Sequence, residues 1–527
     1  MHFARIGTFA ALIVSVSVGV IPAQDGPLLI PPTQPTPPPP ELPTIDSFPS
    51  TELDYRESRA DRLIALRPKG TDFSRPSLER FYAAFESAYG PTYREVPLEA
   101  KAELYEWALE RYHWTPWDQV LPRVILSDDP NAEIGWHQGA DISTWNGAFL
   151  AALSYKYAVT REPETLEKIA RLLRGLHLFL KVTDEMGLPA RCVMKTKQGD
   201  VNRHFVTEDG EEFWFRSDAA KGTLNQIVGG FAVMMLLAYP DLPPDVQAQA
   251  RFDLQEMAYH LIRHDYKLTE RDGKHTKYGN LTPRIGSTGV PFNAQVAYTV
   301  IAAATIFEGP DEGKQRKILK HMQDLRGRHH VYYESPLRHI ILPQRIGASP
   351  FVKGMNDRNH VCNAAYIGLF LERYDAVKNN RPLDSRFCYE LGRTMFWTLR
   401  ELEDHRNALI NFQWVGILSD PDLLPRILKE NEQQPILRQL AKLHADGMEQ
   451  LHRFPINRFG TEGQEADSPV PLWVDARKRH DAYLWKSDAF QAWQSNGQTT
   501  PTHIASIDFL HAYWLMRYWG LDRSVAR

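Results

Sequence analysis

Apolar positions recur with a helical period along most of the chain beyond about residue 50. In the segment 141–158, the spacing i, i+3, i+4, i+7, i+8 is filled by Trp145, Ala148, Phe149, Ala152 and Leu153. This spacing predicts one buried helix face. The polar turn TREPE follows, and a second helix of the same pattern is predicted over 164–181. The two segments together predict a helical hairpin.

The same pairing of helical segments recurs along the chain. Further hairpins are predicted at 219–239 with 243–264, 292–307 with 312–326, 359–374 with 384–402, and 406–418 with 434–452. Two amphipathic segments, 76–88 and 97–112, come before the first hairpin, and 503–519 is a last helix with no partner after it. Because the early helices can close against this last helix, we expect an all-α fold, a single (α/α)6 toroid of six helical hairpins. An open solenoid is the alternative.

Long connections between the hairpins are expected on one face of this scaffold. LPARCVM (188–194) and EEFWFR (211–216) have the composition of short strands, and LTERDGKHTKYGNLTPR (268–284) is predicted to be a polar turn region. The segments 328–358 and 453–502 are longer still. Long ordered loops on one side of a rigid scaffold commonly build a binding site.

Polar residues recur where the first helix of each hairpin is predicted to begin. In a toroid these helices are parallel, so their starts meet at one rim, where helix dipoles and free N–H groups favour acids and anionic ligands. The residues predicted at this rim are Asp141, Asp218, Asn293, Asp357, Asn359, His360, Asn411, Trp414, Thr502 and His503.

Helix capping is the simpler explanation for any one of these residues. Asp, Asn, Ser and Thr are preferred at the N-cap, where each contributes about 1 kcal/mol. Caps alone do not require neighbouring Trp and His, however, and WHQGAD, EFWFRSD and NDRNH supply both. The recurrence therefore favours a shared site.

The first functional hypothesis is hydrolysis of a glycosidic bond, which needs one protonated and one ionised carboxyl group. Asp141 and Asp218 are the expected pair, because neighbouring helices lie about 8–10 Å apart and would place the carboxyl groups at a separation suited to inversion. The preceding Trp214 and Phe215 favour Asp218 as the acid, since apolar surroundings favour a protonated carboxyl. Asp357 is a third catalytic candidate, with Asp272 in reserve. The expected substrate-binding residues are Trp136, His137, Trp145, Trp214, Arg216, His275, Tyr278, Asn293, Asn359 and His360.

Two other functions stay open. A polysaccharide lyase would remove a proton beside a uronate carboxylate, and the candidate residues are His204, His275, Tyr278, Arg216, Arg284 and Asn293. A non-catalytic glycan-binding or scaffold protein would need only the aromatic residues.

No cofactor or metal is expected. The chain has no phosphate-binding loop, dinucleotide fingerprint or G-x-S-x-G motif. His329, His330, Glu334 and His339 lack a recognised ligand spacing. A net charge of −4 gives no electrostatic basis for binding nucleic acid, so the expected partner is a poly- or oligosaccharide. The odd number of cysteines predicts no disulfide framework, although one bridge among Cys192, Cys362 and Cys388 stays possible.

The N-terminus predicts export. An early Arg, an apolar run and Ile-Pro-Ala predict a signal peptide over 1–23, and the proline-rich 24–50 predicts an extended linker before a toroid domain at 51–527. We expect a secreted or periplasmic protein, tethered to the cell surface if the first segment is retained. No other segment is long and apolar enough to span a membrane.

The hairpin sequence GADISTWNGAFLAALSYKYAVTREPETLEKIARLL resembles the six-hairpin glycosidase-like toroids, over roughly 100–520. DGKHTKYGNLTP and DFLHAYWLMRYWG also resemble stretches of uncharacterised secreted bacterial toroid proteins. The first resemblance implies a fold shared by glycoside hydrolases, unsaturated glucuronyl hydrolases and helical domains of polysaccharide lyases. The unsaturated glucuronyl hydrolases place an Asp near inner-helix starts, and Asp141 and Asp218 would be the matching positions.

Overall fold

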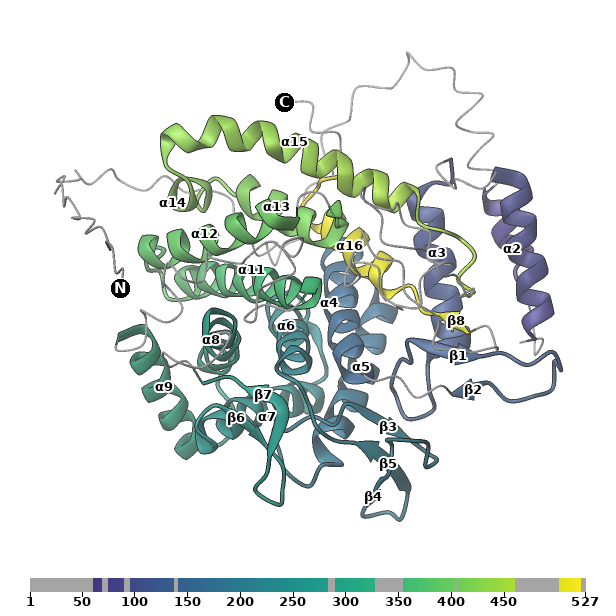
Figure 1. Ribbon diagram of the computed structural model, residues 1–527, viewed down its shortest axis with the longest axis horizontal. Coiled ribbons are helices and arrows are strands. Elements are labelled where there is room, and N and C mark those ends of the chain that lie inside the picture. The colour runs from purple at the N-terminus through teal and green to yellow at the C-terminus, as the bar shows by residue number, and fades with distance from the viewer. Residues whose placement is uncertain are drawn as a thin grey trace, which may run out of the picture.

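The computed structural model describes residues 60–68, 74–89, 95–136, 141–282, 290–327, 354–402, 405–459 and 502–522. These residues are mostly helical, with a few short strands, which confirms the expected all-α class (Figure 1). The helices of the first half are α2 (Arg75–Tyr89), α3 (Leu98–Ala108), α4 (Ile142–Thr160), α5 (Pro163–Lys181), α6 (Lys221–Leu237) and α7 (Pro244–Arg263). Those of the second half are α8 (Val290–Ile306), α9 (Glu312–Gly327), α11 (Gly354–Lys378), α12 (Ser385–Leu402), α13 (Ala408–Ser419), α14 (Leu424–Ile427), α15 (Glu430–His452) and α16 (Ile507–Tyr518).

Most helix boundaries lie within a few residues of those that the periodicity predicts, but two helix starts differ. Helix α11 begins at Gly354, so Asp357, Asn359 and His360 lie inside its first two turns rather than before it. Helix α16 begins at Ile507, and His503 belongs instead to a short strand. Asn359 and His360 are buried within this helix, so these two polar residues belong to a helix interior rather than to a segment before it.

Three small antiparallel sheets accompany the helices. One has the order β2-β1-β8 and joins β1 (Arg123–Ile125) to β2 (Gly135–Trp136) and to β8 (His503–Ile504). A second has the order β3-β5-β4, built from β3 (Cys192–Met194), β5 (Glu212–Arg216) and β4 (Arg203–Val206). The third is a hairpin of β6 (Lys267–Thr269) and β7 (His275–Asn280). Strands β3 and β5 were expected, whereas β4 was not, and the polar turn region proves to contain the β6–β7 hairpin.

The first helices of the hairpins are buried on nearly all sides. Every residue of α6 from Gly222 to Leu237 is buried, as is every residue of α13 from Ala408 to Leu418. Their partners α5 and α7 each bury one face and expose the other. Helix α4 packs against α6 and α16, α8 packs against α6 and α11, and α13 packs against α11 and α16. The partners α5, α9, α12 and α15 cover α4, α8, α11 and α13 in turn, which confirms the helical hairpins.

Two glycines set the close approach of α4 to α6. A Cβ on Gly230 would lie 2.1 Å from the carbonyl oxygen of Gly147, and one on Gly147 would lie 2.6 Å from the carbonyl oxygen of Gln226. Neither position has room for a side chain, because the obstructing atoms belong to the backbone. Glycine therefore lets the starts of these two helices lie side by side.

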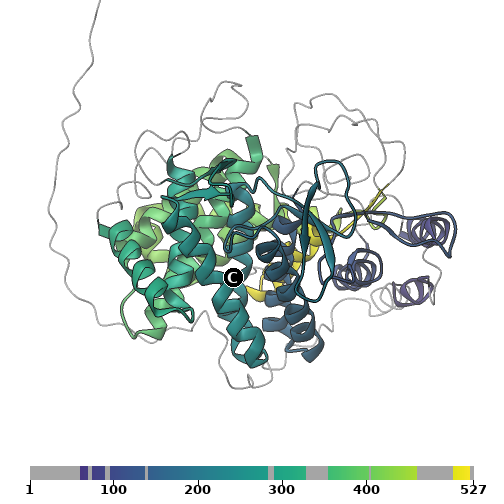
Figure 2. The same ribbon diagram turned by 90° about the horizontal axis from the view of Figure 1, so that it is seen from below.

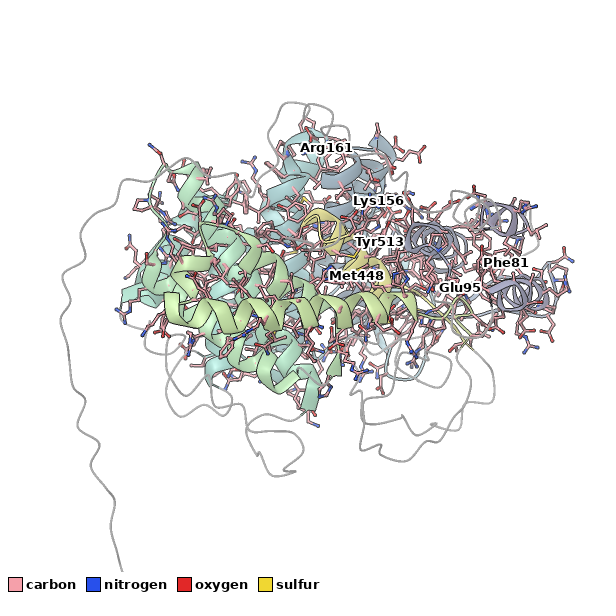
Figure 3. The ribbon with its side chains drawn as sticks, turned by 90° about the horizontal axis from the view of Figure 1, so that it is seen from above. Phe81, Glu95, Lys156, Arg161, Met448 and Tyr513 are labelled. Carbon is pink, nitrogen blue, oxygen red and sulfur yellow. The ribbon has the colours of Figure 1, made fainter. Side chains whose placement is uncertain are left out.

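The earliest described helices pack beside the last one. Helix α3 contacts α16, as the unpaired last helix predicted (Figure 2). Glu106 on α3 binds Lys156 of α4 at 2.6 Å and accepts a hydrogen bond from the indole of Trp514 on α16 at 2.9 Å. Figure 3 shows α15 running across the molecule and Phe81 of α2 at one end.

A chain of buried hydrogen bonds fastens the same region. His113 Nδ1 lies 2.7 Å from the carbonyl oxygen of Leu121. Because a carbonyl oxygen can only accept, this nitrogen carries a proton and donates it. His113 Nε2 then accepts from His503 Nδ1 at 2.8 Å, and His503 Nε2 accepts from the Tyr82 hydroxyl at 2.7 Å. Burial lowers the pKa of His113 to about 3 and holds the pKa of His503 well below its usual value. The chain therefore joins α2 to β8 through neutral imidazoles.

The three cysteines are buried and free, so the possible disulfide is absent. No helix among the described residues has the length and apolar character needed to cross a membrane. The predicted signal peptide and proline-rich linker lie outside the described residues.

Candidate functional site

The starts of four helices meet through polar side chains. Thr144 on α4 and Thr223 on α6 are joined through their hydroxyls at 3.2 Å. Lys221 at the start of α6 donates to Asn293 Oδ1 on α8 at 3.2 Å. Asn225, one turn further along α6, donates to the carbonyl oxygen of His360 on α11 at 3.1 Å. We refer to these six residues, Thr144, Lys221, Thr223, Asn225, Asn293 and His360, as the helix-start cluster.

The His360 ring fits against α6 because Gly222 has no side chain. A Cβ at position 222 would lie 2.4 Å from His360 Nε2. His360 and Asn293 are 5% and 1% exposed, so both are enclosed between helices. Asn293 and His360, both predicted at the rim, thus lie at the start of α6, where Lys221 binds Asn293.

Asp141 makes an ion pair and does not cap its helix. It occupies the N-cap position of α4, yet its side chain makes no capping hydrogen bond. Its Oδ1 instead accepts from Arg191 Nε at 2.9 Å and Nη2 at 2.6 Å. Arg191 and Asp141 are both partly buried, with side chains 12% and 21% exposed. The carboxylate is thereby held in a defined orientation at the start of α4.

Asp218 is not a cap either. Helix α6 begins at Lys221 with Ala220 as its N-cap, two residues beyond Asp218. The backbone of Asp218 is left-handed, with φ of 62°, and its N–H donates to Glu270 Oε1 at 3.1 Å. Its Oδ1 accepts from the backbone N–H of Lys277 at 2.7 Å. The β6–β7 hairpin therefore binds Asp218 at two points, the backbone N–H through Glu270 and the carboxyl group through Lys277.

The segments that carry the two aspartates adjoin each other. The Arg191 N–H donates to the carbonyl oxygen of Arg216 at 2.8 Å, beside the register pair of Cys192 and Arg216 in the β3–β5 ladder. Arg191 holds Asp141, and Asp218 comes two residues after Arg216. The Ser143 N–H also donates to the carbonyl oxygen of Arg191, at 3.1 Å. Asp141 is thus bound by the residue before β3, and Asp218 follows the end of β5 by two residues, each at the start of one of two adjacent helices.

The aromatic candidates have different environments. Trp145 is 5% exposed and packs in the core, so its predicted contact with substrate is wrong for this structure. Trp136 is half-buried on β2, with its ring 5.9 Å from that of Trp117. Trp214 on β5 lies 4.8 Å from the ring of His204 and under the ammonium of Lys197. Tyr278 on β7 is 53% exposed.

Of the other predicted site residues, some lie at the surface, one is buried, and some lie outside the described residues. Arg216 pairs with Asp200 at 3.3 Å, and His275 is exposed with Nδ1 3.0 Å from the Thr269 hydroxyl. Asn359 is buried within α11. His137, Arg284, the histidine-rich 329–339 and the side chain of Asp357 lie outside the described residues.

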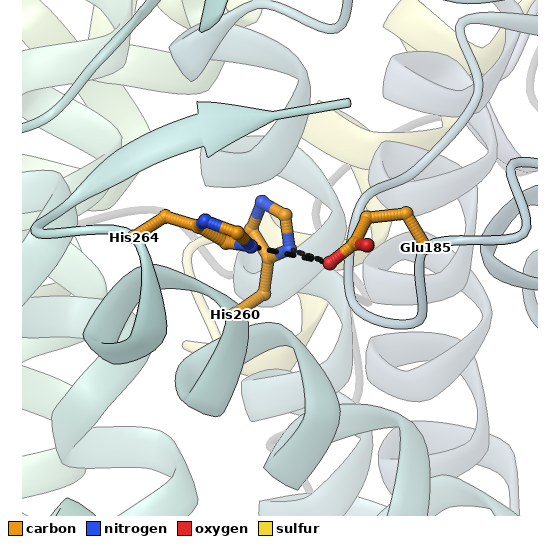
Figure 4. Close-up of side chains that lie close together, drawn as sticks. All are labelled: Glu185, His260 and His264. Carbon is orange, nitrogen blue, oxygen red and sulfur yellow. Dashed lines mark hydrogen bonds and ion pairs between the residues drawn. The ribbon is translucent and has the colours of Figure 1, made fainter. Parts of the chain in front are cut away.

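A second polar cluster lies at the end of α7 and was not anticipated. His260 Nδ1 and His264 Nε2 lie 3.3 and 3.2 Å from Glu185 Oε1 (Figure 4). Arg263 contacts the same carboxylate oxygen. The hydrogen bond from His260, together with His264 and the charge of Arg263, lowers the pKa of Glu185 to about 2. The sequence signal was the H-x-x-x-H spacing on one helix, which places both imidazoles on the same face.

Two histidines and a glutamate within 4.8 Å of one another match the donor types that zinc takes in proteins. Two contacts oppose this use. The Thr269 N–H donates to His260 Nε2 at 3.1 Å, so neutral His260 carries its proton on Nδ1, the nitrogen that faces Glu185. Arg263 also places a positive charge on the carboxylate that a metal would need. The cluster is best described as an ion-pair network that fastens the turn after α5 to the end of α7.

No protein-family model matches this chain, and no curated protein is significantly similar to it in sequence. Function is therefore inferred from the residues of the site.

Proposed function

We propose that this protein is an exported glycoside hydrolase that uses Asp141 and Asp218 as its paired carboxyl groups. The observation that carries the proposal is the position of both aspartates at the starts of adjacent helices: Asp141 is bound by Arg191, whose N–H donates to Arg216, and Asp218 follows Arg216 by two residues. Neither side chain serves as a helix cap, so the simplest structural explanation for both is removed.

As the scaffold of this enzyme we propose an (α/α)6 toroid. The order of packing, α4 to α6, α8, α11, α13, α16 and back to α4, supports it, because each of these helices contacts the next. The resemblance to six-hairpin glycosidase-like toroids agrees with this order. In a toroid, the helix-start cluster and both aspartates belong to one rim.

The two carboxyl groups are suited to different roles. In an inverting hydrolase, a carboxylate activates water while a carboxylic acid protonates the leaving oxygen. Asp141, paired with the Arg191 guanidinium, is the proposed base, since the ion pair orients the carboxylate that would accept a proton from the water attacking the sugar. Asp218, which follows Trp214 and Phe215 and is held by the β6–β7 hairpin, is the proposed acid.

The substrate proposed for this rim is a poly- or oligosaccharide. Lys221 of the helix-start cluster is only partly buried and is placed to hydrogen-bond hydroxyl or carboxylate groups of a sugar, while Asn293 accepts from its ammonium. Export follows from the predicted signal peptide and proline-rich linker, which would place the enzyme outside the cytoplasm with its substrate.

The test is a reducing-end assay on the full-length protein against neutral, uronate-containing and sulfated polysaccharides, with ultraviolet absorbance of the products recorded in parallel. Asp141→Asn and Asp218→Asn should each lower the rate of reducing-end release by about a hundredfold or more, because acid and base catalysis each contribute 10²–10⁴. Asp245→Asn is the matched control, since Asp245 is an exposed acid in the first turn of α7. It should leave the rate unchanged.

Other outcomes identify the competing functions. Product that absorbs in the ultraviolet would mean elimination rather than hydrolysis. Glycan binding without product would indicate a binding or scaffold protein. If both aspartate variants released reducing ends at the rate of the parent protein, the proposed pair would be refuted.

A further inference from the structure

Several buried amide side chains carry hydrogen-bonding atoms that no described protein atom satisfies, and we consider four of these side chains, on α6, α8, α11 and α13. They are Asn225 on α6, Gln295 on α8, Asn363 on α11 and Gln413 on α13, and each is at most 5% exposed. The atoms concerned are Asn225 Oδ1, Gln295 Nε2 and Oε1, Asn363 Nδ2 and Gln413 Oε1. We refer to these four residues as the amide cluster.

The amide cluster lies on helices that pack against one another. Gln413 Nε2 donates to Asn363 Oδ1 at 3.1 Å, which joins α13 to α11. Asn225 donates to the carbonyl oxygen of His360, one turn before Asn363 on α11. A Cβ on Gly229 of α6 would lie 3.1 Å from Asn363 Nδ2. Thr299, one turn after Gln295, donates to the carbonyl oxygen of Ala364 at 3.3 Å.

These contacts place the cluster directly below the helix-start cluster, which shares Asn225 with it. Gln295 follows Asn293 by two residues on α8, and Asn363 follows His360 by one turn on α11. The unsatisfied atoms therefore belong to the interior that continues from the proposed active site.

An unsatisfied buried polar atom costs about 1–3 kcal/mol, and native proteins contain few of them. Five such atoms on four neighbouring helices are a concentrated cost. Natural proteins tolerate local destabilisation of this kind where function requires it. An apolar residue would be better at each position if packing were its only role.

The atoms available define the chemistry of a matching ligand. Two unsatisfied donors and three unsatisfied acceptors are present, with no charged group among the four residues. Exchanging nitrogen and oxygen in both Asn363 and Gln413 leaves this inventory unchanged. A carboxylate needs donors and a metal cation needs acceptors, whereas a hydroxyl group both donates and accepts.

We propose that the amide cluster binds the hydroxyl groups of a neutral sugar ring, as the innermost part of the site at the helix starts. This assignment rests on the proposed function and narrows its substrate to a glycan whose bound residue is uncharged. Amide atoms that no protein atom satisfies then select hydroxyl-bearing ligands strongly, because a ligand without the hydroxyl leaves these atoms unsatisfied.

The experiment compares two buried glutamines in the full-length protein. Gln295 has no partner for either side-chain atom, whereas Gln255 on α7 donates to the carbonyl oxygen of Asp311 and to Gln315 Oε1 and accepts from the Asp311 N–H. Each is changed to Met, which keeps the length and removes the amide. Glucose, galactose, mannose and xylose are tested by saturation-transfer NMR and calorimetry, with glucuronate as the charged comparison.

At least one neutral sugar should bind, and Gln295→Met should weaken its binding about tenfold, the expected loss for two or more hydrogen bonds. The Tm of Gln295→Met should stay unchanged or rise. Gln255→Met should lower the Tm and leave sugar binding unchanged. Gln413→Met serves as a second test of binding if Gln295→Met does not fold.

Three results would overturn the proposal. One is that no neutral sugar binds. Another is that sugar affinity survives both Gln295→Met and Gln413→Met. The third is that Gln295→Met lowers the Tm as much as Gln255→Met does without changing affinity, which would show that ordered water satisfies the amide.

Monosaccharides contain no glycosidic bond to another sugar, so this result does not depend on hydrolysis. Neutral sugars that bind to a protein without hydrolytic activity would support the amide cluster and refute the enzyme. If the protein released reducing ends but bound no neutral sugar, the enzyme would be supported and the amide cluster refuted.

Discussion

The environment of Asp141 depends on a residue fifty positions away. Its sequence neighbours favoured either a helix cap or a site residue, but not a partner. The bond from Arg191 decides the matter, because the guanidinium binds the carboxylate, which makes no capping hydrogen bond to α4. A partner at such a separation follows from the contact of β3 with α4, and no local pattern specifies it.

Trp145 shows the opposite limit. A tryptophan at a helix start suits either a sugar-contacting surface or a core, and the periodicity of its own helix already assigned it to the apolar face. Its burial follows from that periodicity. The hypothesis of substrate contact gave more weight to residue type than to position.

Lys101 offers a test of how one buried charge stabilises the fold. Its ammonium donates to the carbonyl oxygens of Leu451, His452 and Phe454 at 3.3, 2.6 and 2.9 Å, at the end of α15. Burial holds its pKa well below the usual value. Lys101→Met keeps most of the volume but leaves three carbonyl groups without this donor, so we expect a loss of about 2–4 kcal/mol in unfolding free energy.

Urea denaturation monitored by circular dichroism measures this loss. Lys168→Met, which removes a more exposed partner of Glu110, is the control and should change the free energy by less than about 1 kcal/mol. Equal stability of the Lys101 variant and the parent protein would show that water replaces the ammonium at these carbonyl groups.

Helices were predictable here because their pattern extends over many residues and is repeated, and β3 and β5 were predictable from their composition, whereas the β6–β7 hairpin was not. Strand β7 exposes four of its six residues and buries Thr276 and Gly279, which gives no alternation to detect. Its hairpin nonetheless holds Asp218 through the Lys277 N–H. Periodicity therefore could not predict the part of the site that this hairpin forms.

The H-x-x-x-H spacing on α7 predicts which residues lie together, but not what they do. It places His260 and His264 on one face, but their chemistry depends on Glu185 and Thr269, which come from a turn and a strand elsewhere. The tautomer of His260 follows only when the Thr269 contact is known. Spacing could have found the pair, but not that it forms an ion-pair network.

Gly230 tests the contact between α4 and α6. A methyl group there would meet the carbonyl oxygen of Gly147 at 2.1 Å, so Gly230→Ala must force the two helices apart. We expect a loss of about 2–4 kcal/mol, despite the higher helix propensity of alanine. Thermal and urea unfolding of the variant measure the change.

Gly313, in the first turn of α9, is the matched control. A Cβ there would lie 3.2 Å from Asp311 Oδ1 and 4.0 Å from Arg316 Nη2, both of them side-chain atoms that can move. Gly313→Ala should be neutral or stabilise the protein by up to about 1 kcal/mol, as expected for a helical glycine with room for a methyl group. If both alanine variants behaved alike, the close approach of α4 to α6 would not depend on glycine.

Buried side chains join the early part of the described chain to its last part, and the helix pattern does not reveal these contacts. The pattern did predict that the early helices would meet the last one, since a single helix was left without a partner. It did not predict that Tyr82, His503 and His113 would form a buried hydrogen-bonded chain between these regions. Buried neutral histidines of this kind couple global stability to pH.

His113 and His511 give the sign and size of this coupling. Burial lowers the pKa of each from about 6.5 to about 3 in the folded protein. The unfolded chain therefore binds more protons than the folded one between these values, and stability must fall as pH falls below about 6.5. Each histidine should remove about 2 kcal/mol at pH ~5, relative to pH ~7.5.

His503 and His260 shift in the same direction, so they add to the loss. Urea titrations at several pH values between ~5 and ~8 measure the dependence. His511→Gln should reduce its slope by about one proton between pH ~4 and ~6, where only the unfolded imidazole is protonated. An unchanged slope in that variant would mean that His511 is protonated in the folded protein and that its burial does not exclude the charge.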